Sequence, residues 1–288
     1  MKPRDSKSAR RWSILAQSVR GAIHSRRDEP NQDAIETFAV PGAKSPLIVA
    51  LSDGHGSPRS FRSERGAQFA VCVAVAESKR LLADLSGSVA AIRSEAETIL
   101  PTAIVSRWSA RVYEDVTEHP FTAKERRRFV SMYGTVAWRE LRQNPLFAYG
   151  ATLLLAVATR TFLLMAQLGD GDIITISSSG CPTRPMPDDP RLFAGETTSL
   201  CLPDAAESFS VIVRPMKEDR PDLVLLSTDG YANSYEDDDG FLRVGSDFLS
   251  ILREDSVESV QADLETWLEE VSREGSGDDI TVGVLCLI

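Results

Sequence analysis

The stretch Leu47-Ile-Val-Ala-Leu-Ser-Asp-Gly-His-Gly56 joins a short apolar run to a turn that carries an acid and a histidine. A continuous apolar run of this length predicts a strand that is buried on both faces. The two glycines around His55 allow the backbone to approach a ligand closely. The tetrapeptide Asp53-Gly-His-Gly56 arises by chance in about two per thousand chains of this length. We therefore interpret it as a functional turn.

Strand patterns lie on both sides of this stretch. Before it, strands are predicted at Trp12–Gly21 and Asp33–Val40, and a polar loop at Ser25–Gln32 connects them. After it, the apolar residues 150–168 predict two buried strands joined by a tight turn. Further strands are predicted at 173–177, 209–213, 223–227 and 280–288.

Helical patterns fill the middle and the C-terminal part of the chain. From Ser63 to about Gln143 the apolar residues follow the period of a helix, and Pro101 and Pro120 divide this block into three or four helices. Two more helices are predicted near 246–253 and 256–273. Strands close to both ends of the chain, with helices between them, favour an α+β fold whose sheet needs both termini.

One domain is expected over residues 13–288. It contains the helical block at about 63–143 and an irregular excursion at about 178–207 that is rich in Pro, Asp, Ser and Thr. Residues 1–12 are rich in Lys and Arg, and we expect them to form a flexible basic arm.

Composition bounds the class of protein. The 288 residues are 42% hydrophobic and 26% charged, which is ordinary for a globular protein with a sizeable core. The net charge of -10 argues against a general nucleic-acid binder, since phosphate neutralisation needs clustered Lys and Arg. An acidic balance does not argue against a phosphoprotein substrate, because one basic pocket suffices for it.

The cysteines and the apolar segments indicate a cytoplasmic protein. Cys72, Cys181, Cys201 and Cys286 form no C-x-x-C pair, so we expect buried free thiols. No signal peptide pattern is present, and Thr159-Arg160-Thr161 interrupts the most apolar run, so no membrane span is expected.

Acidic residues recur at the edges of the predicted strands. Asp33 opens one strand, Asp53 and Asp229 each follow a strand, and Asp278-Asp279 directly precedes the last. When strands pack in one sheet core, the strand ends that carry these acids can come together. Carboxylates gathered in one place repel one another and have raised pKa values unless a cation neutralises them. An all-oxygen cluster suits Mg²⁺ or Mn²⁺, rather than a zinc site built on Cys and His.

The other acids and histidines are interpreted differently. His55 lies beside a candidate metal ligand and has a side chain that exchanges protons near neutral pH, which predicts a general acid. His24 and His119 are interpreted as structural. Asp170 and Asp172, in Gly-Asp-Gly-Asp, are interpreted as a hairpin turn. Glu236–Gly240 lacks the ligand spacing of a calcium loop.

Taken together, these motifs resemble those of the metal-dependent protein phosphatases, the type 2C serine/threonine phosphatase family, and most of all those of its shorter bacterial branch. The resemblance covers nearly the whole chain, and its strength lies in the order of the motifs. These motifs are Gly21-Ala-Ile-His24, Asn31-Gln32-Asp33, Asp53-Gly54-His55-Gly56, Gly150-Ala151-Thr152, Gly169-Asp170, Gly195-Glu-Thr-Thr198, Thr228-Asp229-Gly230 and Asp278-Asp279-Ile280-Thr281.

The resemblance implies a fold, two divalent cations (Mg²⁺ or Mn²⁺) and a set of site residues. The fold is a central antiparallel β-sandwich with helices on both faces, in four layers αββα, and the site lies at one end of it. His55 would be the general acid. Asp279 would support the ligands without binding metal itself, although Asp278 and Asp279 can exchange these roles. The implied metal ligands are Asp33, Asp53, Asp229, Asp278 and the backbone carbonyl of Gly54.

Two positions depart from the family pattern. Many relatives carry an Arg five residues before the first metal-binding Asp, where it holds the substrate phosphate. Here that position is Asp28, and the adjacent Arg26 and Arg27 are the candidates for phosphate binding. Many relatives also carry an Asp that helps to bind a third metal. Phe147 takes its place here, so we do not expect a tightly held third metal.

The expected reaction is hydrolysis of phosphoserine and phosphothreonine in proteins by water that two metals activate, with a cognate kinase system as the source of the substrate. The protein is expected to be a monomer that binds no nucleic acid and no membrane. Two alternatives from other classes stay open. One is a catalytically silent relative that binds metal or a partner, and the other is a two-metal nuclease, which the acidic balance opposes.

Overall fold

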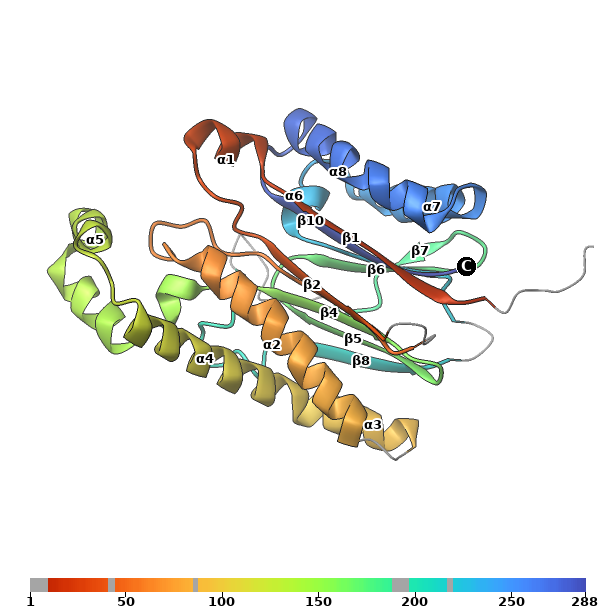
Figure 1. Cartoon of the computed structure of the whole chain (residues 1–288), viewed down its shortest axis with the longest axis horizontal. Helices are drawn as coiled ribbons and strands as arrows, with labels where there is room; N and C mark the ends of the chain where they lie inside the picture. The colour runs from red at the N-terminus through yellow and green to blue at the C-terminus, as the bar shows by residue number, and fades with distance from the viewer. Residues whose placement is uncertain (1–9, 41–44, 85–87, 188–196, 217–219) are drawn as a thin grey trace, which may run out of the picture.

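Two antiparallel sheets stacked face to face form the centre of the molecule (Figure 1). The structure is a computed structural model that describes residues 10–40, 45–84, 88–187, 197–216 and 220–288. One sheet contains, in spatial order, β1 (Trp12–Val19), β10 (Ile280–Leu287), β9 (Leu223–Ser227), β6 (Asp172–Ile176) and β7 (Pro182–Thr183). The other contains β2 (Ala34–Ala39), β3 (Leu47–Ser52), β4 (Leu153–Ala158), β5 (Phe162–Leu168) and β8 (Ser210–Pro215).

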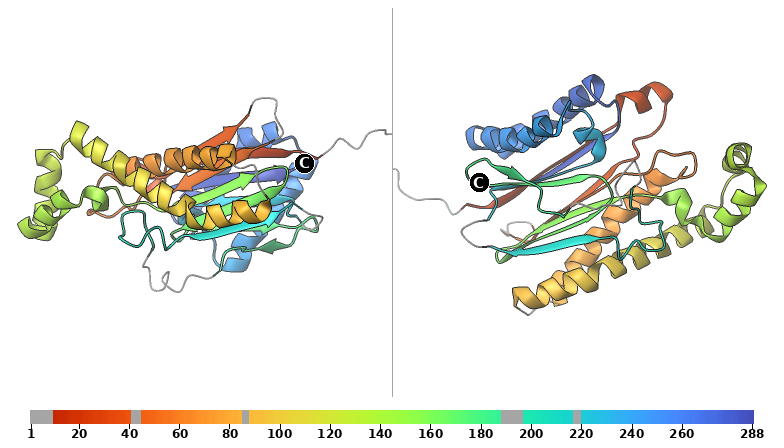
Figure 2. Two further views of the ribbon diagram at one scale, coloured as in Figure 1. Left: turned by 90° about the horizontal axis from the view of Figure 1, so that it is seen from below. Right: turned by 180° about the vertical axis from the view of Figure 1, so that it is seen from behind.

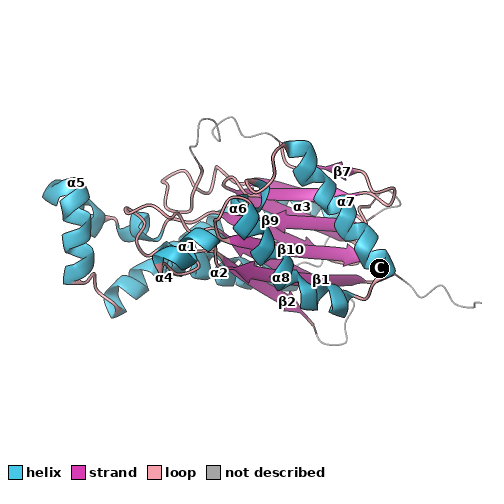
Figure 3. Ribbon diagram, turned by 90° about the horizontal axis from the view of Figure 1, so that it is seen from above, coloured by secondary structure: helices cyan, strands magenta, loops and turns pink. Residues whose placement is uncertain are grey.

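Helices cover the outer face of each sheet, which confirms the predicted α+β sandwich in four layers (Figure 1, Figure 3). On the first sheet lie α7 (Asp238–Glu254) and α8 (Val257–Glu274), with the short α1 (Ala22–Arg27) and α6 (Asp229–Ala232) at one end. The second sheet is covered by α2 (Ser63–Asp84) and α3 (Val89–Thr98), and α4 (Leu100–Glu118) packs against both of these helices. A 3₁₀ turn, η1 (Pro145–Tyr149), leads from α5 (Ala123–Gln143) back to β4.

The two ends of the described chain meet in one sheet. Strand β1 pairs antiparallel with β10 from Trp12 opposite Leu287 to Val19 opposite Ile280. Residues 1–9 of the expected basic arm, 1–12, lie outside the described residues. Arg10 donates to Asp222 at 2.6 Å, and the Arg11 amide donates to the carbonyl of Ile288.

An apolar layer of buried side chains holds the sheets together. Val49, Leu51, Leu226 and Leu285 are fully buried in it. Gly283, in the internal strand β10, faces this layer, and a Cβ there would lie 2.7 Å from Val49 and 2.8 Å from Leu51. The absence of a side chain at Gly283 lets the sheets approach closely at this point.

The burial of the cysteines differs from the expectation. All four are free, as expected, but Cys72 and Cys181 are exposed and only Cys201 and Cys286 are buried.

None of the described helices is long and apolar enough to cross a membrane. The apolar residues 150–168 instead supply the buried strands β4 and β5.

The layer between the sheets predicts a large effect of Leu285→Ala on stability. Removing three buried carbons should lower the free energy of unfolding by about 2–5 kcal/mol, measured by urea denaturation. Val136→Ala is the control, since that side chain is 62% exposed and should change stability by less than about 0.5 kcal/mol. Equal effects of the two substitutions would contradict the sandwich core described above.

Candidate active site

The acidic residues expected at strand edges meet at one end of the sandwich. Asp33 lies just before β2, Asp53 just after β3, Asp229 just after β9 and Asp278 just before β10. Antiparallel pairing and stacking of the sheets bring these four positions to the same end. Three of them, Asp53, Asp229 and Asp278, line a cavity of about 280 Å³, whereas Asp33 is not among its lining residues. The full lining is His24, Gln32, Asp53, Gly54, His55, Gly56, Ser57, Asp170, Asp229, Asp278 and Asp279.

Burial, and after it crowded negative charge, raises the pKa values of the acids in this site. Burial raises the pKa of Asp33 to about 8, and the charges of Asp279 and Asp229 add to the rise. Burial also raises the pKa of Asp53 well above its usual value, with further contributions from Asp33 and Asp229. The pKa of Asp229 is raised by burial and by the charges of Asp170 and Asp278. Without a cation, the site therefore retains protons that isolated carboxyl groups release.

Two threonines fix the orientation of Asp33. The hydroxyl of Thr228 donates to Asp33 Oδ2 at 2.7 Å, and a bond from Thr281 also favours the charged carboxylate. The amide of Thr281 in turn donates to the Thr228 hydroxyl at 2.9 Å. Strand β10 and the end of β9 thus hold an acid that is nearly two hundred residues away in sequence.

The turn after β3 is held by backbone bonds on both sides. The amide of Gly54 donates to the carbonyl of Gln32 at 3.2 Å, and the amide of His55 donates to that of Gly150 at 3.1 Å. A Cβ at Gly54 would lie 2.7 Å from the Gln32 oxygen, so this position needs glycine. Among the described residues, no donor reaches the Gly54 carbonyl oxygen.

His55 packs closely against the backbone of the following motif. A Cβ at Gly150 would lie only 2.6 Å from Cδ2 of the His55 ring, so Gly150 makes room for the imidazole. Burial lowers the pKa of His55, and the nearby charge of Asp170 works against that shift. The protonated imidazole is therefore a stronger acid than usual, and Asp170 stabilises its charge.

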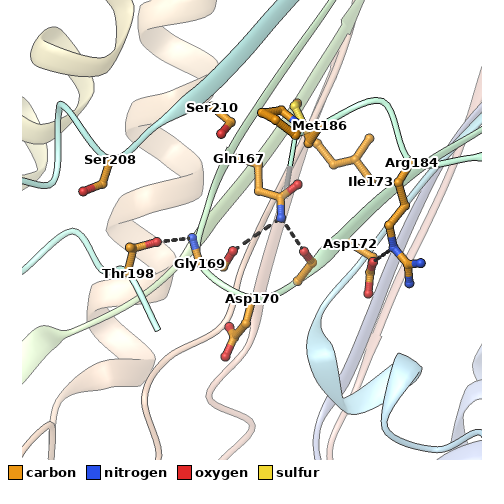
Figure 4. Close-up of a pocket in the computed structure, with 12 residues that line it drawn as sticks. Gln167, Gly169, Asp170, Asp172, Ile173, Arg184, Met186, Thr198, Ser208 and Ser210 are labelled. Atoms are coloured by element: carbon orange, nitrogen blue, oxygen red, sulfur yellow. Dashed lines mark hydrogen bonds and ion pairs between the residues drawn. The ribbon is translucent and has the colours of Figure 1, made fainter. Parts of the chain in front are cut away.

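Asp170 belongs to this site, and the prediction that it forms a hairpin turn with Asp172 is wrong. Strands β5 and β6 lie in different sheets, so the turn between them crosses from one sheet to the other. Figure 4 shows how the turn is fixed: the Gly169 amide donates to Thr198 at 2.8 Å, and the Gln167 side chain donates to the Gly171 carbonyl at 2.8 Å. Gly169 has a φ of 105°, which glycine adopts readily.

The neighbouring acids Asp278 and Asp279 have different surroundings. The Asp279 carboxylate accepts the amides of Gly21 at 2.6 Å and Gln32 at 2.7 Å, and it lies 2.8 Å from Nδ1 of His24. Its side chain is 3% exposed, whereas that of Asp278 is 51% exposed at the cavity. Asp279 therefore ties the N-terminal segment in place, whereas Asp278, whose Oδ1 accepts the Asp279 amide at 2.9 Å, faces the cavity.

His24 lines the cavity, although the sequence offered only a structural role for it. The residue sits in α1, a helix that was not predicted and that extends into the polar loop predicted at 25–32, and the helix has no capping side chain. Tertiary bonds hold α1 instead: the Ala22 amide donates to Ser272, and the Ile23 amide donates to the carbonyl of Gly277. The only signal in the sequence was the Gly21-Ala-Ile-His24 motif.

The candidate phosphate-binding residues lie outside the cavity. Arg26 and Arg27 are exposed in the last turn of α1, and neither lines the cavity. Phe147, which stands at the position of the third-metal Asp of many relatives, is half-buried and packs with the helical core. Lys and Arg are absent from the described lining of the cavity.

The fold and the site together define an α+β sandwich protein with an oxygen-rich acidic centre at one end. Residues 20–269 match the protein phosphatase 2C family, so the chain belongs to that family. No curated protein matches the sequence.

Solved structures share the fold at low sequence identity. The serine/threonine phosphatase Stp1 from Staphylococcus aureus is 14% identical, with a TM-score of 0.59 over 100% of this chain and 99% of that one. The phosphatase PstP from Mycobacterium tuberculosis is 17% identical, with a TM-score of 0.54 over 96% and 98%. The PstP catalytic domain in complex with two manganese ions is also 17% identical, with a TM-score of 0.53 over 96% and 98%.

The raised pKa values predict how the stability of the metal-free protein changes with pH. Folded Asp33 retains its proton up to about pH 8, whereas the unfolded chain releases it near pH 4. The stability that this proton provides is therefore lost as the pH rises towards 8. We expect the free energy of unfolding to fall between pH 6.5 and 8, by up to about 1.4 kcal/mol per pH unit for this one proton. Unfolded histidine is half protonated at about pH 6.5 and largely neutral by about pH 7.5, so the opposing contribution of His55 fades over this range.

Urea denaturation in the presence of a chelator measures this slope. Asp33→Asn should flatten it, and saturating Mn²⁺ should stabilise the protein more at pH 8 than at pH 6.5, since metal and proton compete for the same oxygens. A metal-free stability that stays constant or increases over this range would refute the electrostatic description of the site.

Proposed function

We propose that this protein hydrolyses phosphoserine and phosphothreonine in other proteins, using two divalent cations, Mg²⁺ or Mn²⁺. The observation that carries the proposal is the convergence of Asp33, Asp53 and Asp229 from separate strands, with pKa values raised by their burial and mutual repulsion. Membership of the protein phosphatase 2C family supports the reaction class. The two manganese ions in the PstP catalytic domain support the metal requirement.

The donor atoms fit hard cations. Asp33, Asp53, Asp229 and Asp278 offer carboxylate oxygens, and the turn at Gly54 offers a backbone carbonyl. Oxygen donors of this kind suit Mg²⁺ and Mn²⁺. Asp53 and Asp229 are within hydrogen-bonding reach of each other, an arrangement that is costly for two charged carboxylates and that a shared cation relieves.

Each residue of the site has a distinct task in the proposed mechanism. When bound, the cations supply a water that is ionised near neutral pH and offset charge on the phosphate oxygens. The carboxylates position these cations, and the Thr228 hydroxyl keeps Asp33 in place. Asp279 fixes the backbone of Gly21 and Gln32 and so the segment that precedes Asp33.

His55 is the proposed general acid. It gives its proton to the departing serine or threonine oxygen, and the Asp170 carboxylate favours the protonated form. No side chain needs to form a covalent bond to phosphorus, so Cys201, the one cysteine near this end of the sandwich, has no role in the reaction. Its pKa is raised by burial, which keeps it protonated and unreactive.

The substrate phosphate meets histidines rather than arginines inside the cavity. His24 and His55 are the lining side chains able to carry positive charge. We propose that His24 faces the phosphate from the side of Asp278, and that Arg26 and Arg27 contact the substrate only outside the cavity.

Metal-dependent activity tests the proposal directly. With Mn²⁺, the protein should dephosphorylate phosphoserine and phosphothreonine peptides faster than phosphotyrosine peptides, and EDTA should abolish the activity. Asp229→Asn should lower kcat/KM at least about 10³-fold, because it removes a charge from the centre of the site. Asp263→Asn, on the exposed face of α8, is the matched control. Metal binding without turnover would instead identify a catalytically silent, metal-binding member of the family.

The general acid has a separate signature. His55→Gln should lower kcat about 10²–10⁴-fold on phosphothreonine peptides, the usual range for loss of a general acid. The loss should be far smaller with p-nitrophenyl phosphate, whose leaving group needs little protonation. Stopped-flow and steady-state assays on both substrates measure the difference. Equal losses on both, or isolation of a covalent phosphoenzyme, would exclude the proposed role of His55.

A further inference from the structure

Helix α5 stands apart from the sheets at the end of the molecule where the cavity lies. Figure 1 shows α1 and α5 at this end, and Figure 2 and Figure 3 show α5 extending beyond the rest of the fold. A capping box starts the helix: the Glu125 amide donates to Thr122, and the Glu125 side chain accepts from the Thr122 amide. At Gly134, with a φ of 82°, the helix divides into two halves.

The helix carries positive charge on an otherwise acidic protein. It has six basic side chains against the two acids Glu125 and Glu140, in a chain with a net charge of -10. All six are exposed, and none forms an ion pair with any residue that the structure describes. Exposed arginines elsewhere, such as Arg111 and Arg273, do have such partners. The unpaired set is Lys124, Arg126, Arg127, Arg128, Arg139 and Arg142.

Large apolar side chains are exposed on the same helix. Met132 is 54% exposed, Tyr133 38% and Val136 62%. Phe129, Trp138 and Leu141 are buried and attach α5 to the core. Tyr133 packs against Phe129, with ring centroids 4.9 Å apart, which leaves Met132 and Val136 as the exposed apolar side chains outside this attachment. In the first half of α5, Arg128 and Met132 are four residues apart and share a face, so charge and apolar surface lie together.

Two contacts, one exposed and one buried, connect α5 to the rim of the cavity. Ser57 lines the cavity, and two residues later the guanidinium of Arg59 lies 5.8 Å from the centre of the Tyr133 ring. Further along the same loop, Arg62 is buried and pairs with both carboxylate oxygens of Glu125, at 2.7 and 3.1 Å. The rim therefore continues through Arg59 onto the exposed face of α5.

We propose that α5 docks an acidic segment of a phosphoprotein whose phosphate enters the cavity, an inference that rests on the proposed function. Carboxylates or further phosphates of the segment pair with Arg126, Arg127 and Arg128, and an apolar side chain contacts Met132 and Val136. The cavity itself is acidic and repels such a segment, so cations outside it are needed for recognition. An anionic membrane would also attract α5, but it would not require the rigid connection to the cavity rim.

The test compares two variants with equal loss of charge. The variant R126Q/R127Q/R128Q removes three cations from α5 and retains good helix formers. The control R11Q/R160Q/R220Q removes three cations that line a pocket at the opposite end of the sandwich. The substrates are a phosphothreonine peptide flanked by Glu, the same peptide flanked by Gln, and p-nitrophenyl phosphate.

The first variant should lose about tenfold in kcat/KM on the Glu-flanked peptide, through KM, as expected for several weak exposed charge pairs. Its activity on p-nitrophenyl phosphate should be unchanged, and the control should match the wild type on every substrate. For the wild type, KM of the Glu-flanked peptide should rise with salt. An unchanged KM in the first variant, or an equal loss in the control, would overturn the docking proposal.

Binding measurements separate docking from catalysis. Fluorescence anisotropy with labelled peptides, on an Asp229→Asn background, reports affinity whether or not the protein turns over substrate. Tighter binding of the Glu-flanked peptide that depends on residues 126–128 supports docking even if hydrolysis is never observed. Sedimentation with phosphatidylserine vesicles covers the membrane alternative: vesicle binding that requires residues 126–128, together with equal affinity for the two peptides, would replace our proposal.

Discussion

Burial of the carboxyl groups of Asp33, Asp53 and Asp229, together with their mutual repulsion, is the constraint around which this structure is organised. Burial is the larger cause of their raised pKa values, and the charges of neighbouring acids add to it. The cost is offset by the apolar layer between the sheets, which lies immediately behind the site and contains Leu51 and Leu226, a few residues from Asp53 and Asp229. A divalent cation removes the repulsion, so the same crowding that weakens the metal-free protein favours metal binding.

The N-terminal segment reaches the site through one buried acid. Asp279 accepts the amides of Gly21 and Gln32, and it therefore spans the two ends of the segment that leads into Asp33. Because β1 pairs with β10 along its whole length, Asp279 at the start of β10 lies where that segment must turn. Asp278 and Asp279 are adjacent acids with the same chemistry. Asp279 is buried and supports the backbone, whereas Asp278 is exposed to the cavity, and this difference in surroundings gives them different roles.

The sequence predicted what local patterns encode and missed what only tertiary contacts create. The apolar run before Asp53 and the acids at the strand edges were sufficient to predict an α+β fold and the acidic cluster, whereas the sandwich followed from the family resemblance of the ordered motifs. His24 was missed because α1 has no capping signal and depends on Ser272 and Gly277, far away in the chain. Asp170 was misread because Gly-Asp-Gly-Asp describes a turn equally well whether the next strand returns to the same sheet or crosses to the other.

The distribution of charge follows from the same constraint. A site built from carboxylates attracts cations strongly, but it also repels any phosphoprotein that approaches before the metals are bound or beyond the reach of their field. Screening limits that field to about 10 Å at 0.1 M salt. Attraction of an acidic partner therefore has to come from a separate, exposed part of the molecule.

Helix α5 meets this requirement because its cations have no ion-pair partners among the described residues, and because Arg59 and Arg62 connect it to the rim of the cavity. Recognition and chemistry can then be altered independently, since substitutions on α5 leave the metal ligands untouched.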